Sequence, residues 1–340
     1  MPSSTSSSDP AAPHALSEQE KFFPARGTPA EIRAIRRAIA GLLATMALLL
    51  AVSELGARYL YPRVSHLQQR IVSDQRVVES LARDNKAADP RPDPPTVLFV
   101  GNSLLLHALD YPKMQEDLAP DARAVRYAIE NTEYIDWYYG LRRLFAEGVH
   151  PSTVALVLNL GQTLSHGILT DSPRQLFQAR DLYAASREAG MDTTQISSLM
   201  FSHWSAFYAG REGIRNYILN VSDPAYAREL HRLARVPPKF PPEDVMIAQS
   251  RARLKRIDQL CRDNGVRFVL VVPPALGERS DLLLKAGAFE GVDVDAPIPM
   301  ASLGADFFLA DRYHLNERGS ALFTEALAKD LRSRLAVKAR

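Results

Sequence analysis

Two short segments of the sequence carry side chains that suit nucleophilic catalysis. The first reads G-N-S-L and contains Gly101, Asn102 and Ser103, directly after a short apolar run. A serine at the start of a helix lies beside backbone N–H groups that favour developing negative charge. The second segment reads D-R-Y-H-L-N and contains Asp311 and His314. A carboxylate three residues before an imidazole can orient one ring nitrogen and leave the other free to accept a proton, so the two segments together predict a Ser-His-Asp triad.

Each segment by itself also has an ordinary structural interpretation. A serine two residues after a glycine is usually a helix cap, and a histidine near a surface loop is usually only a surface residue. Catalysis is favoured because each segment follows a predicted strand, one near the beginning of the folded domain and one near its end.

The elements that position these segments alternate between strands and helices. Continuous apolar runs predict strands buried on both faces. The predicted strands are 96–100, 124–129, 154–160, 267–272 and 306–309, and the longest predicted helices are 134–147, 243–262 and 317–335. This alternation predicts an α/β fold with a mostly parallel sheet flanked by helices. Ligands of such sheets bind beyond the carboxyl ends of the strands, where both segments fall.

The order of the two segments resembles the SGNH/GDSL hydrolase family, which has a G-D-S-L block after its first strand and a D-x-x-H block before its last helix. The resemblance covers about residues 96–335. It implies an SGNH-hydrolase-like, flavodoxin-like fold of three layers. It also implies that Ser103 is the nucleophile, His314 the general base and Asp311 the residue that orients it.

The sequence departs from the family pattern where the oxyanion is bound. Asn102 stands in place of the family's aspartate, and the family's asparagine in its third block is replaced by Thr163, with Gln162 beside it. We expect the N–H of Ser103 to serve as one oxyanion donor, with Gln162, Thr163 or Asn131 as the second.

These departures and a predicted membrane segment resemble the membrane-tethered branch of the family, which includes the alginate O-acetylation and lipoteichoic acid D-alanylation proteins. The resemblance implies an acyltransferase or esterase that acts on ester-linked groups of a cell-envelope polysaccharide. It also implies a multi-spanning membrane-bound O-acyltransferase as a partner. Two alternatives remain open: a non-catalytic scaffold or glycan-binding protein, and a periplasm-facing carboxylesterase or lipase.

The N-terminal part predicts a single membrane anchor. Residues 1–30 are rich in Ser, Pro and Ala, whereas residues 38–57 form an apolar stretch of 20 residues with one charge near its end. A helix of that length spans about 30 Å, the thickness of the hydrocarbon layer. We therefore expect a disordered cytoplasmic tail at 1–37, an anchor in the bacterial inner membrane at 38–57 and a periplasmic domain thereafter. A cleaved signal peptide and a buried core helix are the alternatives.

Residues 58–95 predict a juxtamembrane helix and a Pro-rich linker. Val64, Leu67, Ile71, Val78 and Leu81 recur at intervals typical of an amphipathic helix. Such a helix can pair with a second copy to form a homodimer through residues 64–81, or it can lie against the main domain. The catalytic domain is then expected at 96–340, with a helical insertion at about 165–242.

Aromatic residues recur in two of the predicted helical stretches. Within the insertion, Phe201, Trp204 and Phe207 can either bind a polysaccharide or pack between helices, and the spacing favours packing. The segment that contains Tyr134 and Trp137 is predicted to be a core face.

Composition excludes several functional classes. The chain has 41 Lys and Arg against 39 Asp and Glu, a net charge of +2. This balance argues against nucleic-acid binding as the main activity. A single cysteine, Cys261, excludes a disulfide framework and a multi-cysteine metal site within one chain. No G-x-G-x-x-G dinucleotide motif is present, and we expect neither a cofactor nor a metal.

Overall fold

The structure is a computed structural model, and it describes residues 28–87, 94–223, 225, 240–275, 279–299 and 302–336. The chain divides into two units, Met1–Ser53 and Glu54–Arg340. The second unit contains the sheet and both segments that the sequence singles out.

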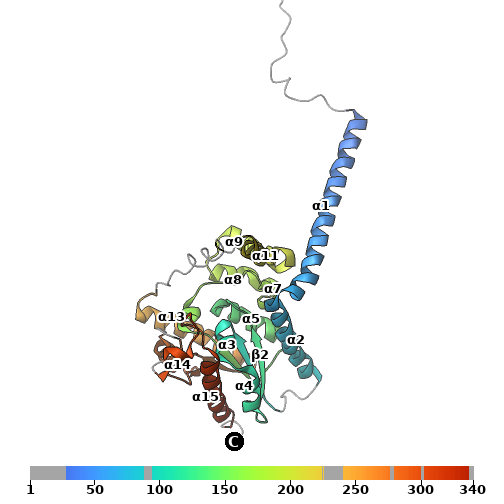
Figure 1. Cartoon of the computed structure of the whole chain (residues 1–340). Coiled ribbons are helices and arrows are strands. Elements are labelled where there is room, and N and C mark those ends of the chain that lie inside the picture. Colours follow the sequence, from blue (N-terminus) through green and yellow to red (C-terminus); the bar gives the residue numbers. More distant parts are fainter. Residues whose placement is uncertain are drawn as a thin grey trace, which may run out of the picture. The chain divides into compact units, whose positions relative to one another are not determined.

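Five parallel strands form the sheet of the second unit (Figure 1). They are β1 (Thr96–Gly101), β2 (Arg123–Ala128), β3 (Thr153–Val157), β4 (Arg267–Val271) and β5 (Val294–Asp295). Their order across the sheet is β2-β1-β3-β4-β5. In this order the chain leaves β1 toward one edge and β3 toward the other, so the ends of β1 and β3 form the topological switch point where α/β folds bind ligands.

Helices cover both faces of the sheet, which confirms the predicted α/β fold. Leu98 and Val100 of β1 pack into one buried cluster, and Val97 and Phe99 pack into the other. The first cluster includes residues of α2 (His66–Ala87), α5 (Tyr134–Ala146), α13 (Glu243–Asp263) and α14 (Ser280–Glu290). The second includes residues of α3 (Ser103–Ala108), α4 (Tyr111–Leu118) and α15 (Glu317–Ala336). Because successive strand residues point to opposite faces, continuous apolar runs are what this three-layer arrangement requires.

The predicted strand at 306–309 is wrong. Residues Ala305–Phe307 form a 3₁₀ turn, and Phe308 makes only an isolated antiparallel bridge with Leu315. The fifth strand is β5, whose two residues are too few to give a periodic signal. The predicted core face of α5 is confirmed, because Tyr134 and Trp137 are fully buried.

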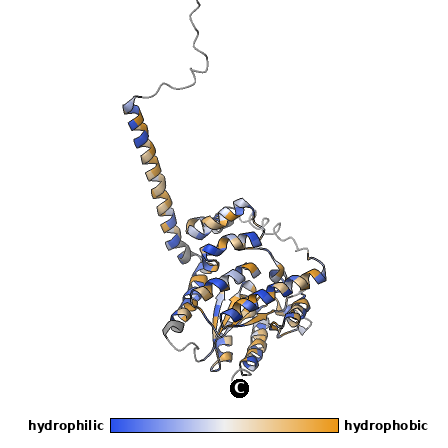
Figure 2. Cartoon of the chain, turned by 180° about the vertical axis from the view of Figure 1, so that it is seen from behind, coloured by the Kyte–Doolittle hydropathy of each residue, from blue (hydrophilic) through white to orange (hydrophobic). Residues whose placement is uncertain are grey.

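The long helix α1 (Pro29–Val64) contains the predicted anchor. Its segment Pro29–Tyr59 is long and apolar enough to cross a membrane, and none of its most apolar window is buried. Figure 2 shows the apolar colouring along this helix. This exposure favours the predicted anchor over the alternative of a buried core helix. The helix begins at Pro29, within the predicted tail, and residues 1–27 of that tail lie outside the described part of the chain.

Helix α2, which the sequence predicts as a juxtamembrane helix, packs against the domain that contains the sheet. Ile71 and Val78 are each 1% exposed and belong to the core cluster, whereas Leu67 faces solvent. The side chain of Val64 lies outside the described residues. The apolar residues that a homodimer would need are thus largely used within one chain, which favours the alternative that this helix lies against the main domain.

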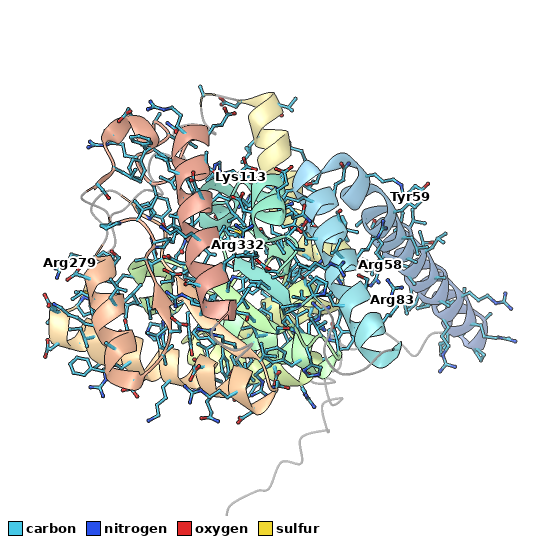
Figure 3. All side chains as sticks on the ribbon, turned by 90° about the horizontal axis from the view of Figure 1, so that it is seen from below. Arg58, Tyr59, Arg83, Lys113, Arg279 and Arg332 are labelled. Carbon is cyan, nitrogen blue, oxygen red and sulfur yellow. The ribbon has the colours of Figure 1, made fainter. Side chains whose placement is uncertain are left out.

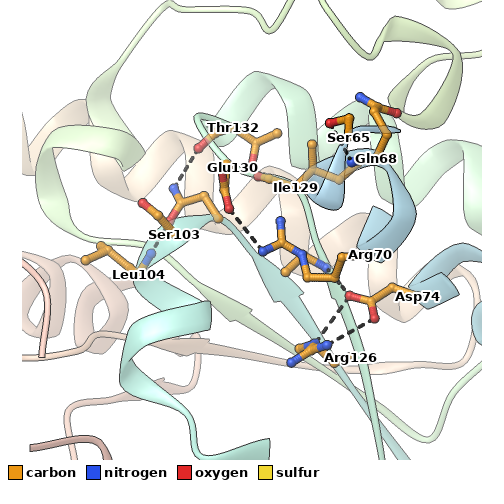
Figure 4. A network of polar contacts seen from close by, with 12 residues as sticks. Ser65, Gln68, Arg70, Asp74, Ser103, Leu104, Arg126, Ile129, Glu130 and Thr132 are labelled. Carbon is orange, nitrogen blue, oxygen red and sulfur yellow. Dashed lines mark hydrogen bonds and ion pairs between the residues drawn. The ribbon is translucent and has the colours of Figure 1, made fainter. Parts of the chain in front are cut away.

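Two ion pairs attach α2 to the edge of the sheet (Figure 4). Arg70 binds the carboxylate of Glu130 at 3.0 Å. Asp74 accepts two hydrogen bonds from Arg126 of β2, at 3.2 and 3.3 Å, and one from the N–H of Ala128 at 3.4 Å. Asp74, which interrupts the apolar pattern of α2, therefore provides a hydrogen-bond acceptor for a backbone N–H of the edge strand β2.

The segment between β3 and α13 is helical. It contains α6 (Leu160–Leu164), α7 (Pro173–Leu176), α8 (Leu182–Glu188), α9 (Thr193–Trp204), α10 (Ala206–Ala209) and α11 (Arg211–Ser222). Residues 224 and 226–239 of the predicted insertion, and residues 88–93 of the predicted linker, lie outside the described residues. The predicted packing of Phe201, Trp204 and Phe207 is wrong, since all three are exposed.

Candidate active site

Ser103 lies two residues after the end of β1 and is the first residue of α3. Asn102 caps this helix: its side-chain oxygen accepts the N–H of Leu104 at 2.9 Å, and its amide donates to the carbonyl of Thr132 at 2.7 Å. Asn102 is 1% exposed, so both bonds are formed inside the protein. Asn102 therefore links the loop after β1 to the loop after β2.

A close contact between β1 and β3 explains the glycine before this cap. A Cβ at Gly101 would lie 2.8 Å from the carbonyl oxygen of Val157. Real Cβ atoms do not approach a backbone oxygen so closely, and a side chain here would push the two strands apart. The absence of a side chain at Gly101 thus allows the ends of β1 and β3 to lie close together next to Ser103.

The second segment folds into a tight hairpin. The N–H of Leu309 donates to the carbonyl of His314 at 2.8 Å, and Phe308 bridges to Leu315. Arg312, between them, has a φ of 59°, in the left-handed region that a sharp turn needs. The turn brings Asp311 beside His314.

Asn316 joins the hairpin to α15. Its side-chain oxygen accepts the N–H of Gly319 at 3.1 Å, and its amide donates to the carbonyl of Asp306 at 2.7 Å. A Cβ at Gly319 would lie 2.5 Å from the carbonyl oxygen of Phe307. The asparagine cap and the glycine therefore hold the start of α15 against the turn that precedes the hairpin.

Ser103, His314 and Asp311 form a continuous chain of hydrogen bonds. His314 Nε2 lies 2.9 Å from Ser103 Oγ, and His314 Nδ1 lies 2.7 Å from Asp311 Oδ2. Ser103 and His314 are half-buried and Asp311 is exposed. Residues 211 positions apart in the sequence thus meet with the geometry of a nucleophile, a base and an orienting group.

The surroundings of Asp311 keep its carboxylate ionised. Burial by itself raises the pKa of this group, but hydrogen bonds from the His314 ring and from the N–H groups of Tyr313 and His314 outweigh that effect and lower the pKa to about 2. An ionised Asp311 accepts the Nδ1–H of His314, which leaves Nε2 as the acceptor for the Ser103 hydroxyl proton.

A second histidine lies against the base. The rings of His107 and His314 are 4.6 Å apart between centroids. Partial burial lowers the pKa of His107, and the neighbouring His314 lowers it further. His107 is therefore neutral at pH 7.

Two of the three residues predicted as the second oxyanion donor, Thr163 and Gln162, already form structural hydrogen bonds. The hydroxyl of Thr163 donates to the carbonyl of Asn159 at 2.7 Å. Gln162 forms a capping box with Asn159 at the start of α6. Asn131 is exposed in the loop after β2 and has a φ of 58°. The structure thus brings the three triad residues together and gives Thr163 and Gln162 structural hydrogen bonds.

Asn159 was missed by the sequence analysis. The strand register pairs Gly101 with Val157, so Ser103 and Asn159 each follow two residues after this pair, where the neighbouring strands β1 and β3 end. Its amide nitrogen lies 2.6 Å from the hydroxyl of Tyr313, the residue before His314. It is the first polar residue after the apolar run of β3, and this position is the signal in the sequence that could have indicated it.

Neither a metal cluster nor a reactive cysteine accompanies this site. Among the residues that the structure describes, no three His, Cys, Asp or Glu side chains are grouped so that they could hold a metal ion. Cys261 is fully buried, and burial raises the pKa of its thiol, so the thiolate is not formed at neutral pH.

Comparisons with known proteins give distant structural likenesses. No protein-family model matches the chain, and no curated protein sequence matches it. TesA is 16% identical over 68% of this chain and 95% of its own, with a TM-score of 0.34. A GDSL-like lipase from Bacteroides thetaiotaomicron is 10% identical over 76% of this chain and 97% of its own, with a TM-score of 0.36. The functional argument therefore rests on the geometry of the site.

Proposed function

We propose that this protein is a membrane-anchored serine acyltransferase or esterase of the SGNH/GDSL type. The observation that carries the proposal is the hydrogen-bond chain from Ser103 through His314 to Asp311 at the carboxyl end of the sheet. The proposed substrates are ester-linked acyl groups of a cell-envelope polysaccharide.

The reaction proceeds through an acyl-enzyme. Ser103 Oγ attacks the ester carbonyl while His314 Nε2 accepts its proton, and the negative charge of Asp311 stabilises the resulting imidazolium. His314 then returns the proton to the departing alcohol, which leaves an acyl group on Ser103. In the second half, a sugar hydroxyl or water loses its proton to His314 and attacks this ester, and the proton returns to Ser103 as the acyl group leaves.

Two donors are proposed for the oxyanion. The N–H of Ser103 lies in the first turn of α3, where backbone N–H groups have no partner within the helix. The amide of Asn159 is the second donor, because it ends the neighbouring strand and one of its two hydrogens remains after the bond to Tyr313. Removing one oxyanion donor typically lowers kcat by about 10²–10³-fold. Asn159→Ala is therefore expected to lose activity in that range without loss of fold.

The helix α1 is proposed as a retained anchor that leaves the catalytic domain in the periplasm. Contacts of its last turns with the domain support retention, because Glu54 and Arg58 hydrogen-bond to residues 204–207. Fusions after Arg340 test the orientation: alkaline phosphatase should be active there and green fluorescent protein dark. The reverse pattern contradicts both the localisation and the substrate class.

Transfer and hydrolysis differ only in the acceptor that resolves the acyl-enzyme. An anchored site lies close to a donor delivered by a membrane protein, and we propose transfer, with a multi-spanning membrane-bound O-acyltransferase as the partner. The full chain in detergent is given an activated acetyl ester with and without oligosaccharide. Acetylated oligosaccharide formed at the expense of free acetate supports transfer, and equal acetate release in both samples identifies an esterase.

A further inference from the structure

Helices α9, α10 and α11 expose large apolar side chains. Phe201 and Trp204 of α9 are 63% and 66% exposed, and Phe207 of α10, Ile218 and Val221 of α11 are also exposed. These five residues are called the apolar face below. Helix α10 contacts both α9 and α11, so these exposed side chains lie on neighbouring helices. Large exposed apolar residues grouped on one part of a protein are typical of a surface that contacts a partner or a membrane.

The three helices that carry the apolar face are held together by one arginine. The guanidinium of Arg211 donates to the hydroxyl of Ser202 at 3.1 Å and to that of Ser198 at 2.9 Å, both on α9. It also lies over the ring of Tyr208, 4.0 Å from the centroid. The apolar face is therefore presented by a connected group of helices.

A carboxylate near the end of the apolar helix binds the start of α10. Glu54 accepts hydrogen bonds from the hydroxyl of Ser205 at 2.8 Å, the N–H of Ala206 at 3.0 Å and the N–H of Phe207 at 3.1 Å. All four residues belong to the unit Glu54–Arg340. An unpaired carboxylate in an apolar membrane segment is costly, and these bonds supply the partners that it needs.

An arginine one turn later makes a second attachment. Arg58 donates to the backbone carbonyl of Trp204 at 3.0 Å and pairs with Glu54 at 2.6 Å. Tyr59, its neighbour, is 60% exposed, and Figure 3 shows the two side chains on the same helix. A cation and an aromatic ring at the end of an apolar helix are typical of the membrane–water interface.

The depth of these contacts follows from helix geometry. Glu54 lies three residues before Ala57, the end of the apolar stretch, and a rise of 1.5 Å per residue puts it about 5 Å from that end. The headgroup region on each side of the hydrocarbon layer is about 5–7 Å thick. If α1 spans a membrane with residues 38–57 in the hydrocarbon layer, Glu54 lies about 5 Å inside that layer and Arg58 lies just outside it. Trp204 and Phe207, which form hydrogen bonds with these two side chains, then lie close to the boundary between the hydrocarbon layer and the headgroups.

We propose that the apolar face inserts at the boundary between the headgroups and the acyl chains of the bilayer that α1 crosses. The occupant is a lipid surface, since exposed Trp and Phe side chains beside basic residues are the composition that binds at this depth. The inference rests on the anchor assigned under the proposed function. It gives the catalytic domain a second attachment to the membrane, besides the helix itself.

The two tryptophans of the chain provide the test. Trp137 is fully buried in the core, whereas Trp204 is part of the apolar face. The full chain is reconstituted into phosphatidylcholine–phosphatidylglycerol vesicles whose acyl chains are brominated close to the headgroup. Bromine quenches tryptophan on contact, so we expect the emission of Trp204, measured as the difference between wild type and Trp204→Phe, to be largely lost.

A matched control places a tryptophan on the other side of the sheet. Leu322 is exposed on α15, and its neighbour Phe323 belongs to the opposite core cluster from Leu199 of α9. Leu322→Trp in the Trp204→Phe background should keep its emission. The result counts for chains that float with the vesicles and resist carbonate extraction. In such chains, equal quenching at positions 204 and 322 overturns the proposal, and so does an absence of quenching at 204. If carbonate extracts the chain from the vesicles, α1 is not a membrane anchor, and the proposal fails together with the anchor.

Discussion

His314 Nδ1 lies 2.7 Å from Asp311 Oδ2, while the other carboxylate oxygen accepts the N–H groups of Tyr313 and His314 at 2.9 and 3.0 Å. One side chain therefore closes the turn and orients the ring. The base and its orienting group come from four consecutive residues, so their geometry depends on this hairpin rather than on distant packing. Of the three triad residues, only Ser103 comes from another part of the chain.

The substitution Asp311→Asn separates these two roles. The amide oxygen of the substituted side chain can still accept one or both backbone N–H groups, but its NH₂ group cannot accept the Nδ1–H of His314. The imidazole then loses the tautomer that accepts the serine proton, and kcat should fall by about 10⁴-fold with little change in KM. Steady-state kinetics on an activated ester, with circular dichroism as the check of folding, measures this. A folded Asp311→Asn enzyme of near wild-type rate contradicts the orienting role.

His107 should make the folded state sensitive to mild acid. Its pKa in the folded protein is lower than the ordinary value of 6.5, so the unfolded chain binds this proton first as the pH falls. Stability is therefore lost as the pH falls through 6.5. The thermal midpoint in detergent should fall more steeply for wild type than for His107→Asn between about pH 7.5 and 5.5. Parallel pH dependences for the two proteins would show that burial and the neighbouring His314 do not lower the pKa of His107 in the folded protein.

The packing of α2 predicts a contrast between two apolar residues of the same helix. Ile71 is 1% exposed in the core and Leu67 is 36% exposed. Ile71→Ala should lower the free energy of unfolding by about 2–5 kcal/mol, and Leu67→Ala by less than about 0.5 kcal/mol. Urea unfolding in detergent measures both. Equal small effects, together with disulfide cross-linking of chains that carry Ile71→Cys, would instead support pairing of α2 with a second copy.

Much of the fold follows from local sequence patterns. The apolar runs at 96–100 and 267–272 predict β1 and β4 to within one residue, because strands buried on both faces cannot alternate with polar residues. The run at 306–309 predicts a strand that does not exist, since Phe307 and Phe308 face the α15 side from a turn. The true fifth strand is too short for any periodicity to indicate it.

Some residues of the candidate site can likewise be predicted from the sequence, whereas others cannot. Ser103, Asp311 and His314 are predictable because their chemistry needs particular residue types at particular spacings. Asn159 is not, since its position beside Ser103 depends on the register between β1 and β3. His107 and its contact with His314 depend on how α3 packs beside the hairpin, and no local pattern encodes that arrangement.

The reactivity of Ser103 tests the central claim most directly. A fluorophosphonate forms a covalent bond only with a serine whose proton a neighbouring base accepts, and peptide mass spectrometry locates the modified residue. We expect modification of the full-length wild-type chain at Ser103, none in Ser103→Ala, and a loss of labelling rate of several orders of magnitude in folded His314→Ala. A wild-type chain that stays unmodified, or one that is labelled equally fast without His314, would contradict it and leave this fold as a non-catalytic scaffold.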